Sequence, residues 1–462
     1  MTASIFDIAA DLDTPVSAYL KLKPFRPRFL LESVEGGERL ARYSFIGFGD
    51  CLEFRLDRNG LQIGAVQLPR PDDQAALLGA LRRALGEAPR PELDGQAFPL
   101  LGGLVGAAGY DLVRYFERLP SHAQAVDDCP DAHYLAPRSL LVFDHLTRRA
   151  ALLHAGSERD RQSLRRDVIR AMRGGLPGPA WQASYSTPEG SLSEADFIRG
   201  VDRTKEYIAA GDVYQLVLSV CFSGRCDLDP FEVYRALRLL NPSPYMYFCE
   251  LGDRTVVGSS PEALVKLNGQ HAQMRPIAGT RPRGREPAQD RAFEIELLAD
   301  PKENAEHVML VDLARNDLGR VASAGSVAVE PYRSIERYSH VMHIVSGVNG
   351  LLAPGKDAFD LFAAAFPAGT LVGAPKVRAM EIIDELEPVR RGFYGGTVGY
   401  FGHGGDMDQA ITIRTIVFHG DTYRFQAGAG IVADSVPATE YQEVLAKSSV
   451  LRGALALARE GL

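Results

Sequence analysis

Two pairs of glutamates in the second half of the chain have the spacing at which carboxylates share one face of a helix. Glu303 and Glu306 lie in "DPKENAEHVMLVDLARND" (300–317), and Glu440 and Glu443 lie in "TEYQEVLAK" (439–447). Because residues three apart on a helix are neighbours, the like charges of each pair repel one another. A single pair can be a solvated helix face, but two pairs can supply oxygen ligands to a hard cation such as Mg²⁺. The pattern therefore suggests a magnesium site between two helices.

Two glycine-rich segments in the same half could bind an anion. In "QAGAGIV" (426–432), which follows a predicted strand, we expect a turn where Gly428 and Gly430 let backbone N–H groups approach a ligand closely. Most GxG segments are simply tight turns. "FPAGTLVGAPKVRAM" (366–380) contains Thr370 and a proline placed to begin a helix, whose N-terminus favours negative charge.

Three further side chains allow a structural or a chemical interpretation. Arg414 interrupts the strand-like "AITIRTIVF" and is either an edge residue or an inward-facing anion clamp. His343 in "HVMHIVSG" is either a core histidine or an acid/base group. Lys447 follows Glu443 by four residues and should share its helix face.

Composition narrows the class of protein. With 46% hydrophobic and 24% charged residues, the 462-residue chain is globular and long enough for two domains, or for one large sandwich with an added unit. The net charge of −8 does not favour nucleic acid as a partner. No apolar run has membrane length, the start does not resemble a signal peptide, and the five cysteines form no CxxC pair, so we expect a cytoplasmic protein without disulfides.

The elements that must hold these residues change character along the chain. Residues 1–175 contain short apolar strands and then a charged helix over 158–174, which predicts a sheet-rich domain. Residues 176–192 are rich in Gly, Pro and Ser and read as a linker. "SEAD" (193–196) predicts the start of a helix, and from there to residue 462 strands alternate with helical stretches, as in an α/β or α+β catalytic domain.

Several motifs together resemble one enzyme family, that of the chorismate-binding domains of anthranilate, aminodeoxychorismate, isochorismate and salicylate synthases. The resemblance covers nearly all of residues 195–455, and the motifs occur in the family's order. They are "RPIAGTRPRG" (275–284), "EHVMLVDLARND" (306–317), "YSHVMHIVS" (338–346), "GAPKVRAMEII" (373–383), "FYGGTVGYF" (393–401), "QAGAGIVADSVP" (426–437) and the segment 440–447. The resemblance implies an α+β fold with a large two-layer β-sheet sandwich flanked by helices, and an Mg²⁺-dependent activity on chorismate.

The resemblance also implies roles for individual residues. Mg²⁺ would lie between the ring carboxylate of chorismate and the two glutamate pairs. The residues that resemble the family's binding site for the pyruvyl end of chorismate are Arg414, Tyr394 and the amides of Gly428 and Gly430. Lys447 would lie near the ring carboxylate. Gly279, Thr280 and Thr370 lie in motifs that face the substrate in the family.

Three positions distinguish among family members. Glu262 in "GSSPEALVK" resembles the general acid that protonates the departing C4 hydroxyl. Members that use water have a lysine base where this chain has Gln215, and an amide can orient ammonia but cannot deprotonate water. Ala278 replaces the covalent lysine typical of aminodeoxychorismate synthases. We therefore expect ammonia to give 2-amino-2-deoxyisochorismate and then anthranilate and pyruvate, with His343 assisting the elimination.

The N-terminal part suggests regulation. "FLLESVEGGERLARYSFIG" (29–47) and "NPSPYMYF" (241–248) resemble the segments that bind the feedback inhibitor L-tryptophan in family members. The alternative is that both are strands and turns of an interface between domains. The candidate inhibitor residues are Glu32, Ser33, Arg42, Pro244, Tyr245 and Met246.

No cysteine lies in a Gly-flanked nucleophile elbow, so glutamine hydrolysis would require a separate glutamine amidotransferase subunit. Two other functions remain open at this point. One is a subunit of aminodeoxychorismate synthase, or an enzyme that stops at 2-amino-2-deoxyisochorismate. The other is a non-catalytic amino-acid sensor with the same fold.

Overall fold

The computed structural model describes residues 6–34, 42–92, 98, 100–125, 127–176, 178, 183–338 and 341–462. Within these residues, twenty-one strands join into one curled, antiparallel sheet, and three more form a small separate sheet. The small sheet consists of β15 (Ile277–Pro282), β17 (Ser334–Arg337) and β18 (Val341–Val345).

The large sheet draws its strands from both parts of the chain. The first part contributes β1 (Ile8–Ala9), β2 (Pro27–Glu32), β3 (Tyr43–Asp57), β4 (Gly60–Ile63), β5 (Val66–Leu68), β6 (Gly103–Ala108), β7 (Ala132–Asp144) and β8 (Arg149–His154). The rest of the chain contributes β9 (Glu189–Gly190), β10 (Gln215–Arg225), β11 (Tyr245–Leu251), β12 (Arg254–Ser260), β13 (Ala263–Asn268), β14 (His271–Met274), β16 (Ala328–Val329), β19 (Val348–Leu351), β20 (Gly373–Ala374), β21 (Thr397–Gly402), β22 (Met407–Ile411), β23 (Thr415–His419) and β24 (Thr422–Ile431).

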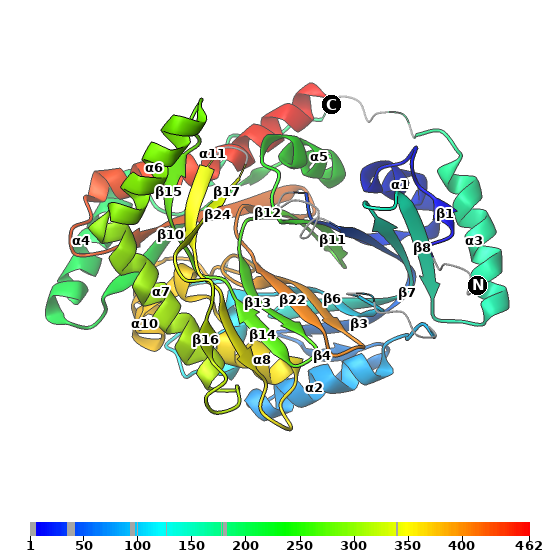
Figure 1. Ribbon diagram of the computed structural model, residues 1–462, viewed down its shortest axis with the longest axis horizontal. Coiled ribbons are helices and arrows are strands. Elements are labelled where there is room, and N and C mark those ends of the chain that lie inside the picture. Colours follow the sequence, from blue (N-terminus) through cyan, green and yellow to red (C-terminus); the bar gives the residue numbers. More distant parts are fainter. Residues whose placement is uncertain are drawn as a thin grey trace.

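Helices cover the outer sides of the sheet. They are α1 (Pro15–Lys21), α2 (Gln74–Glu87), α3 (Glu158–Met172), α4 (Glu194–Ala210), α5 (Pro230–Leu240), α6 (Pro287–Ala299), α7 (Pro301–Gly319), α8 (Ala358–Ala365), α9 (Gly369–Val372), α10 (Lys376–Leu386) and α11 (Pro437–Glu460), with 3₁₀ turns at Lys23–Phe25 and Tyr110–Tyr115. The sheet curls into two layers: α5 and α11 lie over β12 and β24, and α2 and α8 cover the opposite side beside β3, β6 and β13 (Figure 1). The predicted two-layer α+β sandwich is confirmed.

The two parts of the chain share this sheet through direct strand pairing. β2 pairs with β11, with Glu32 opposite Met246, and β6 pairs with β21 over its whole length. The division into a domain of residues 1–175, a linker at 176–192 and a domain of residues 193–462 stays a prediction. Residues 177 and 179–182 of that linker lie outside the described residues.

Local sequence signals explain where the helices begin. Asp300 caps α7, because its side chain accepts hydrogen bonds from the backbone N–H groups of Lys302 and Glu303. Ser193 caps α4 by accepting from the N–H of Asp196, as the "SEAD" signal predicts. The charged helix expected over 158–174 is α3.

Two local predictions differ from the structure. The segment "QAGAGIV" is not a turn, because Gly428 and Gly430 lie inside β24. "AITIRTIVF" is not one strand, because the chain leaves β22 after Ile411 and enters β23 at Thr415, and Arg414 lies in the break.

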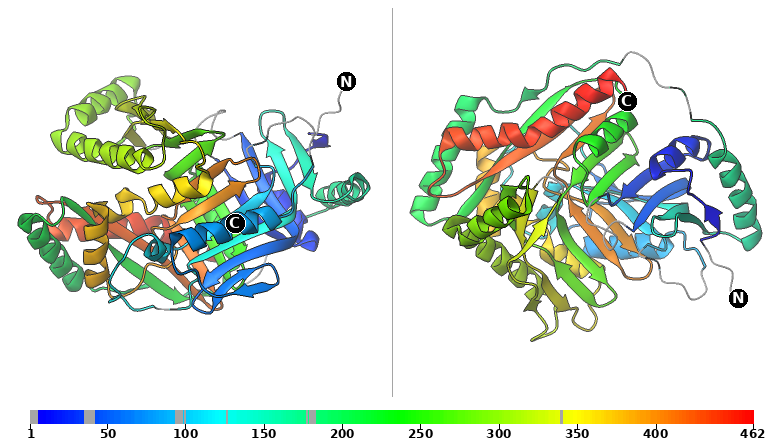
Figure 2. Two further views of the ribbon diagram at one scale, coloured as in Figure 1. Left: turned by 90° about the horizontal axis from the view of Figure 1, so that it is seen from below. Right: turned by 45° about the horizontal axis from the view of Figure 1, so that its top comes forward.

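The helices α6 and α7 and the small sheet form a lobe that projects to one side of the large sheet (Figure 2). Helix α7 packs on β15 in that lobe, and also on α8 and α9 beside the main sheet. The first glutamate pair is therefore carried by the lobe, whereas the second is carried by α11. No described helix is long and apolar enough to cross a membrane, and all five cysteines are free.

Candidate active site

A cavity of about 550 Å³ opens where the α7 lobe faces β10, β24 and α11. Apart from His343, every residue predicted to bind substrate or metal or to act in catalysis lines it. They are Gln215, Glu262, Gly279, Thr280, Glu303, Glu306, Thr370, Tyr394, Arg414, Gly428, Gly430, Glu440, Glu443 and Lys447. Residues from nine separate segments of the sequence thus meet in one place.

His343 lies on β18 and contacts Gly279 and Thr280, two residues that line this cavity. Its Nδ1 lies 2.8 Å from the carbonyl oxygen of Gly279 and 3.1 Å from Thr280 Oγ1. A carbonyl can only accept, so Nδ1 carries the proton and Nε2 is the acceptor of the neutral ring. Removal from solvent lowers the pKa of His343, and Arg414 lowers it further, while the bond to Gly279 raises it. The ring is therefore neutral at pH 7.

Glu262 lies in the short connection between β12 and β13. The surrounding protein replaces solvent around its carboxyl and raises the pKa of Glu262 to about 7, although a hydrogen bond from Thr370 and the charge of Lys447 act in the opposite direction. Thr370 Oγ1 donates to Glu262 Oε1 over 3.1 Å. A carboxyl with this pKa can hold a proton near neutral pH and release it to a leaving group.

The two glutamate pairs line the cavity from α7 and α11. Burial, together with the charges of Glu306 and Asp300, raises the pKa of Glu303. Burial and the charge of Glu443 likewise raise the pKa of Glu440. Each pair therefore contains a carboxylate that a nearby cation would stabilise in its charged form.

The cations of the protein only partly balance these carboxylates. Arg281 Nη1 lies 3.6 Å from Glu303 Oε1, and Lys447 Nζ lies 2.6 Å from Glu443 Oε1. Among the described residues, no group of three or more His, Cys, Asp or Glu side chains is arranged to hold a metal ion. The donors are nevertheless the hard oxygens that Mg²⁺ prefers, and Mg²⁺ commonly binds through one or two carboxylates and takes its other ligands from water or substrate. The residues fit Mg²⁺ in that mode.

Backbone amides of β24 face the cavity. Ser219 and Val217 of β10 pair with Gly428 and Gly430. However, the Ser219 N–H donates to Glu387 and the Val217 carbonyl accepts from Arg391, so neither group is turned toward β24. In an antiparallel ladder both residues of such a pair turn their backbone groups outward. The register of β23 on β24 ends at Phe425, so the amides of Gly428 and Gly430 remain open to a ligand.

The same two glycines make room for neighbouring side chains. A Cβ at Gly430 would lie 2.6 Å from Gln215 Nε2, and a Cβ at Gly428 would lie 3.0 Å from the Tyr394 hydroxyl. Gln215 uses this space to donate from Nε2 to Glu306 Oε1 over 3.2 Å. The glycines are therefore needed for close packing inside a strand, and not for a turn.

Arg414 has a backbone conformation that only a few non-glycine residues adopt. Its φ is 48°, in the left-handed region, where it separates β22 from β23. Its side chain lines the cavity, and Nη1 donates to Asn241 Oδ1 over 3.1 Å. Such a conformation persists only where surrounding structure fixes it, and it is common at binding sites.

The cavity also contains residues that the sequence did not single out. Lys302 directly precedes Glu303 in the first turn of α7 and could have been found from that motif. Gln426 is buried, and its Nε2 donates to Ser219 Oγ over 2.8 Å. Its role depends on a contact 207 residues away in sequence, which no local pattern predicts.

A second cavity of about 610 Å³ is lined by all six candidate inhibitor residues, from Glu32 to Met246. It lies where β2 pairs with β11. The Glu32 carboxylate accepts from the Tyr234 hydroxyl and from Arg238 Nε, the latter over 3.0 Å, and Arg42 pairs with Asp144 over 3.0 Å.

Lys266 and Asp408 also line this second cavity and were not predicted. Asp408 contacts Lys266 and the hydroxyl of the predicted Tyr245, each over 3.0 Å. Residues 35–41 of the first inhibitor motif lie outside the described residues.

Known proteins are similar to this chain over nearly its whole length. The chain matches the family described as chorismate binding enzyme over residues 26–453. It is 46% identical to anthranilate synthase component 1 from Thermus thermophilus, with 98% of this chain and 97% of that protein covered. It is 45% identical to the protein of the same name from Pseudomonas putida, with 98% and 94% covered.

Solved structures show the same architecture. Anthranilate synthase component I from Streptococcus pneumoniae superposes with a TM-score of 0.79 at 34% identity, covering 89% of this chain and 92% of that one. A menaquinone-specific isochorismate synthase from Escherichia coli gives a TM-score of 0.70 at 19% identity, covering 95% and 90%, which shows a shared fold.

Proposed function

The chain belongs to the family of chorismate binding enzymes, and we propose that it converts chorismate and ammonia into anthranilate and pyruvate, as a lyase of tryptophan biosynthesis. The observation that carries the proposal is the presence of Glu262 and Gln215 in one cavity. The first is a carboxyl with a pKa of about 7 that can protonate a leaving hydroxyl, and the second is a neutral amide that can orient ammonia but cannot activate water.

Substrate binding follows from the charges of the cavity. Chorismate carries a ring carboxylate and an enolpyruvyl carboxylate, and a protein of net charge −8 must meet them with local donors. We assign the enolpyruvyl carboxylate to Arg414, Tyr394 and the amides of Gly428 and Gly430. Lys447 and the glutamate pairs face the ring carboxylate.

The glutamates Glu303, Glu306, Glu440 and Glu443 would hold Mg²⁺ together with the substrate. The ion, when bound, would neutralise the ring carboxylate and polarise the ring. The support is the donor chemistry of the two pairs and the raised pKa values of Glu303 and Glu440, which indicate negative charge that the protein alone does not balance.

The residues of the chain divide the reaction into two steps. In the first, Gln215 orients ammonia toward C2, a C–N bond forms, and the C4 hydroxyl leaves as water with the proton of Glu262. This gives 2-amino-2-deoxyisochorismate. In the second, the C2 proton and the enolpyruvyl group leave, and pyruvate and the aromatic ring of anthranilate result. Neutral His343, with Nε2 free to accept, assists this elimination.

Two further assignments complete the proposal. L-Tryptophan inhibits by binding the cavity lined by Ser33 and Tyr245, and a separate glutamine amidotransferase subunit supplies ammonia from glutamine. The word "component" in the names of the relatives supports a partner of this kind. The contacts of Glu32 with Tyr234 and Arg238 leave Ser33 and backbone groups to receive the amino group of the inhibitor.

Product identification tests the proposal. We expect the purified chain, given chorismate, Mg²⁺ and ammonium chloride, to release fluorescent anthranilate together with pyruvate. Accumulation of 2-amino-2-deoxyisochorismate or of its 4-amino isomer would assign the chain to another branch of the family, and the absence of any turnover would favour a sensor. Glu306→Gln is the matched control: it keeps size and packing but removes a metal-facing charge, and we expect no product.

A further inference from the structure

A third, smaller cavity of about 100 Å³ adjoins the 550 Å³ cavity of the candidate active site, which we call the reaction cavity. Tyr394 and Gln426 line both. Its other walls come from residue 125 and residues 127–131, from the start of β12 and from β24. The charged residues that line it are Arg254, Arg390, Arg391 and Arg424 together with Asp111, Asp127 and Asp131.

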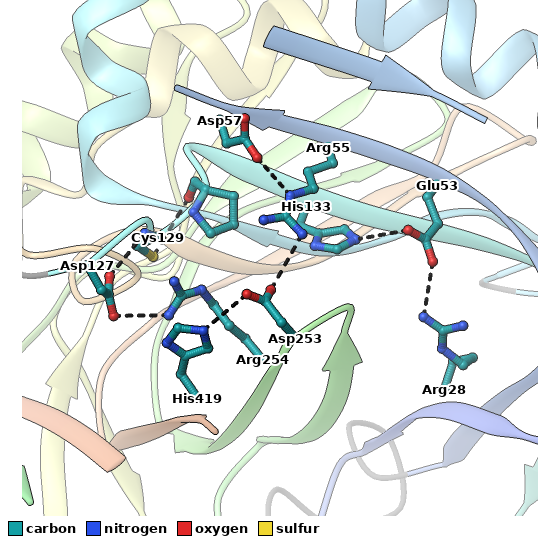
Figure 3. Close-up of polar contacts among 11 residues, drawn as sticks. Arg28, Glu53, Arg55, Asp57, Asp127, Cys129, His133, Asp253, Arg254 and His419 are labelled. Carbon is teal, nitrogen blue, oxygen red and sulfur yellow. Dashed lines mark hydrogen bonds and ion pairs between the residues drawn. The ribbon is translucent and has the colours of Figure 1, made fainter. Parts of the chain in front are cut away.

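Arg254 is the most deeply buried of the incompletely paired cations in this cavity. Its side chain is 1% exposed, and Nη1 donates to Asp127 Oδ2 over 3.0 Å. Its Nε and Nη2 are buried and have no hydrogen-bond partner among the residues that the structure describes. The neighbouring Asp253 does not supply one, since it pairs with Arg55 over 3.4 Å and with His419 over 3.1 Å (Figure 3).

Two guanidinium groups share the Asp127 carboxylate. Arg424 Nη1 also contacts Asp127 Oδ2, over 2.9 Å. The carboxylate is therefore engaged by both cations, and Arg254 Nε and Nη2 stay without an acceptor among the described residues. Unpaired donors of a charged group are costly in a buried site, and an anionic acceptor removes this cost.

The opposite wall also has a guanidinium donor without an acceptor. Asp131 pairs with Arg70 over 2.7 Å and also interacts with Arg390. Arg390 Nε is buried and lacks a partner in the described part of the chain. By contrast, Asp111 and Arg391 are balanced by Arg114 and Glu387 outside the cavity.

We propose that this cavity binds a small oxyanion of single negative charge, held by Arg254 on the side of Asp127. The volume of the cavity restricts the ligand to a few heavy atoms, such as a short monocarboxylate or dihydrogen phosphate. The ligand would contact Tyr394 and Gln426, which the substrate also meets. Two sources share this chemistry: the pyruvate released in the proposed reaction, and inorganic phosphate from solution. Only the first source rests on the proposed function.

Calorimetric titration of the full chain with sodium pyruvate and, separately, with inorganic phosphate tests the site. We expect Arg254→Met to weaken binding of the preferred anion at least tenfold. Val417→Phe should do the same with Arg254 in place, because Val417 lines this cavity and not the reaction cavity. Arg26→Met is the matched control, since it disrupts an exposed ion pair with Asp50 outside the cavity and should bind like the wild type.

The outcomes distinguish the two sources of the anion from each other, and they also test whether the site binds an anion at all. If pyruvate binds, phosphate does not, and Val417→Phe removes the binding, the ligand is the product of the reaction. If phosphate binds in this way and pyruvate does not, the ligand is free phosphate. If Arg254→Met does not fold, Val417→Phe still decides. Unchanged binding in Val417→Phe, or no binding of either anion to the wild-type chain, would mean that water satisfies Arg254 and would overturn the proposal. Neither result would bear on whether anthranilate is made.

Discussion

Glu262 illustrates how a single position acquires chemistry from its surroundings. Its motif "GSSPEALVK" marks it as a candidate acid, but the pKa of about 7 depends on the removal of solvent around it and on Thr370, which comes from α9 and is 108 residues away. The sequence could therefore predict the residue, but could not predict the state of its carboxyl.

The first prediction uses that hydrogen bond. Because Thr370 lowers the pKa of Glu262, Thr370→Val should raise it. An acid acts in its protonated form, so the rate of the wild type should fall as pH rises through about 7, and in Thr370→Val this fall should begin at higher pH. The pH profile of kcat with saturating ammonia measures it. Thr204→Val, a buried change on α4 far from the cavity, should leave the profile in place. If the fall in kcat with rising pH occurs at the same pH in Thr370→Val as in the wild type, Glu262 is not the acid.

The second prediction concerns the space that Gly430 leaves for Gln215. Gly430→Ala places a methyl group 2.6 Å from Gln215 Nε2, and the flexible amide must move. A displacement of about 1 Å can cost on the order of 10²-fold in rate, so we expect a loss of this size in kcat with little change in stability. Gly79→Ala on α2, which meets nothing within 4 Å, is the control. Normal amination by Gly430→Ala would show that Gln215 does not orient the nucleophile.

Other residue contacts could not be predicted because their partners are distant in sequence. Glu32 is a candidate inhibitor residue from its motif, yet its carboxylate is bound by Tyr234 and Arg238, which lie more than 200 residues away. Arg42 likewise pairs with Asp144.

At the scale of elements, the sequence predicted helices more reliably than the glycine-rich strands. The capping signals at Ser193 and Asp300 are local, and the helices begin there. The glycines of β24 look like turn residues in sequence. They are needed because the side chains of Gln215 on β10 and of Tyr394 occupy the space beside them, and such distant contacts have no local signature. The break at Arg414 has the same origin, since a left-handed arginine is fixed by tertiary contacts.

The third prediction concerns the buried pair that orients β10. Arg391 and Glu387 lie 2.6 Å apart with side chains 2% exposed, and they bind the backbone of Val217 and Ser219. Removal of one partner leaves an uncompensated buried charge, so Arg391→Met should lower the free energy of unfolding by about 3–5 kcal/mol.

Urea unfolding measures this effect. The double variant Arg391→Met with Glu387→Leu should recover much of the loss, because no lone charge remains. Glu206→Gln on α4 breaks an exposed pair, with side chains 51% and 65% exposed, and should cost far less, because solvent screens this pair. Equal costs in Arg391→Met and Glu206→Gln would contradict a structural role for the buried pair.

At the scale of the whole molecule, one sheet joins the parts that the sequence separates. The sequence suggested two domains because its composition changes near residue 176, but strand pairing between β2 and β11 depends on residues some 215 positions apart and has no local signal. The cavity proposed to bind the inhibitor lies across that pairing, so a ligand there contacts both parts of the chain without touching the reaction cavity.

The fourth prediction follows from this position. Ser33→Phe should fill the inhibitor cavity and remove a hydrogen-bond partner, at a cost of roughly 1–3 kcal/mol, or about tenfold or more in tryptophan affinity. Activity with ammonia should persist. Calorimetry of tryptophan binding, with and without chorismate and Mg²⁺, should also show that each ligand weakens the other by the same factor. Ser163→Phe on exposed α3 is the control. Unchanged affinity in Ser33→Phe would place the inhibitor elsewhere.

The choice of ammonia over water is the central claim, and isotopic labelling tests it most directly. The purified chain is incubated with chorismate, Mg²⁺ and ¹⁵N-ammonium in H₂¹⁸O, and the products are identified by mass spectrometry. We predict anthranilate that carries one ¹⁵N, pyruvate in equal amount, and no product with ¹⁸O at C2. Isochorismate that carries ¹⁸O at C2 would show that the cavity activates water and would contradict the roles assigned to Gln215 and Glu262.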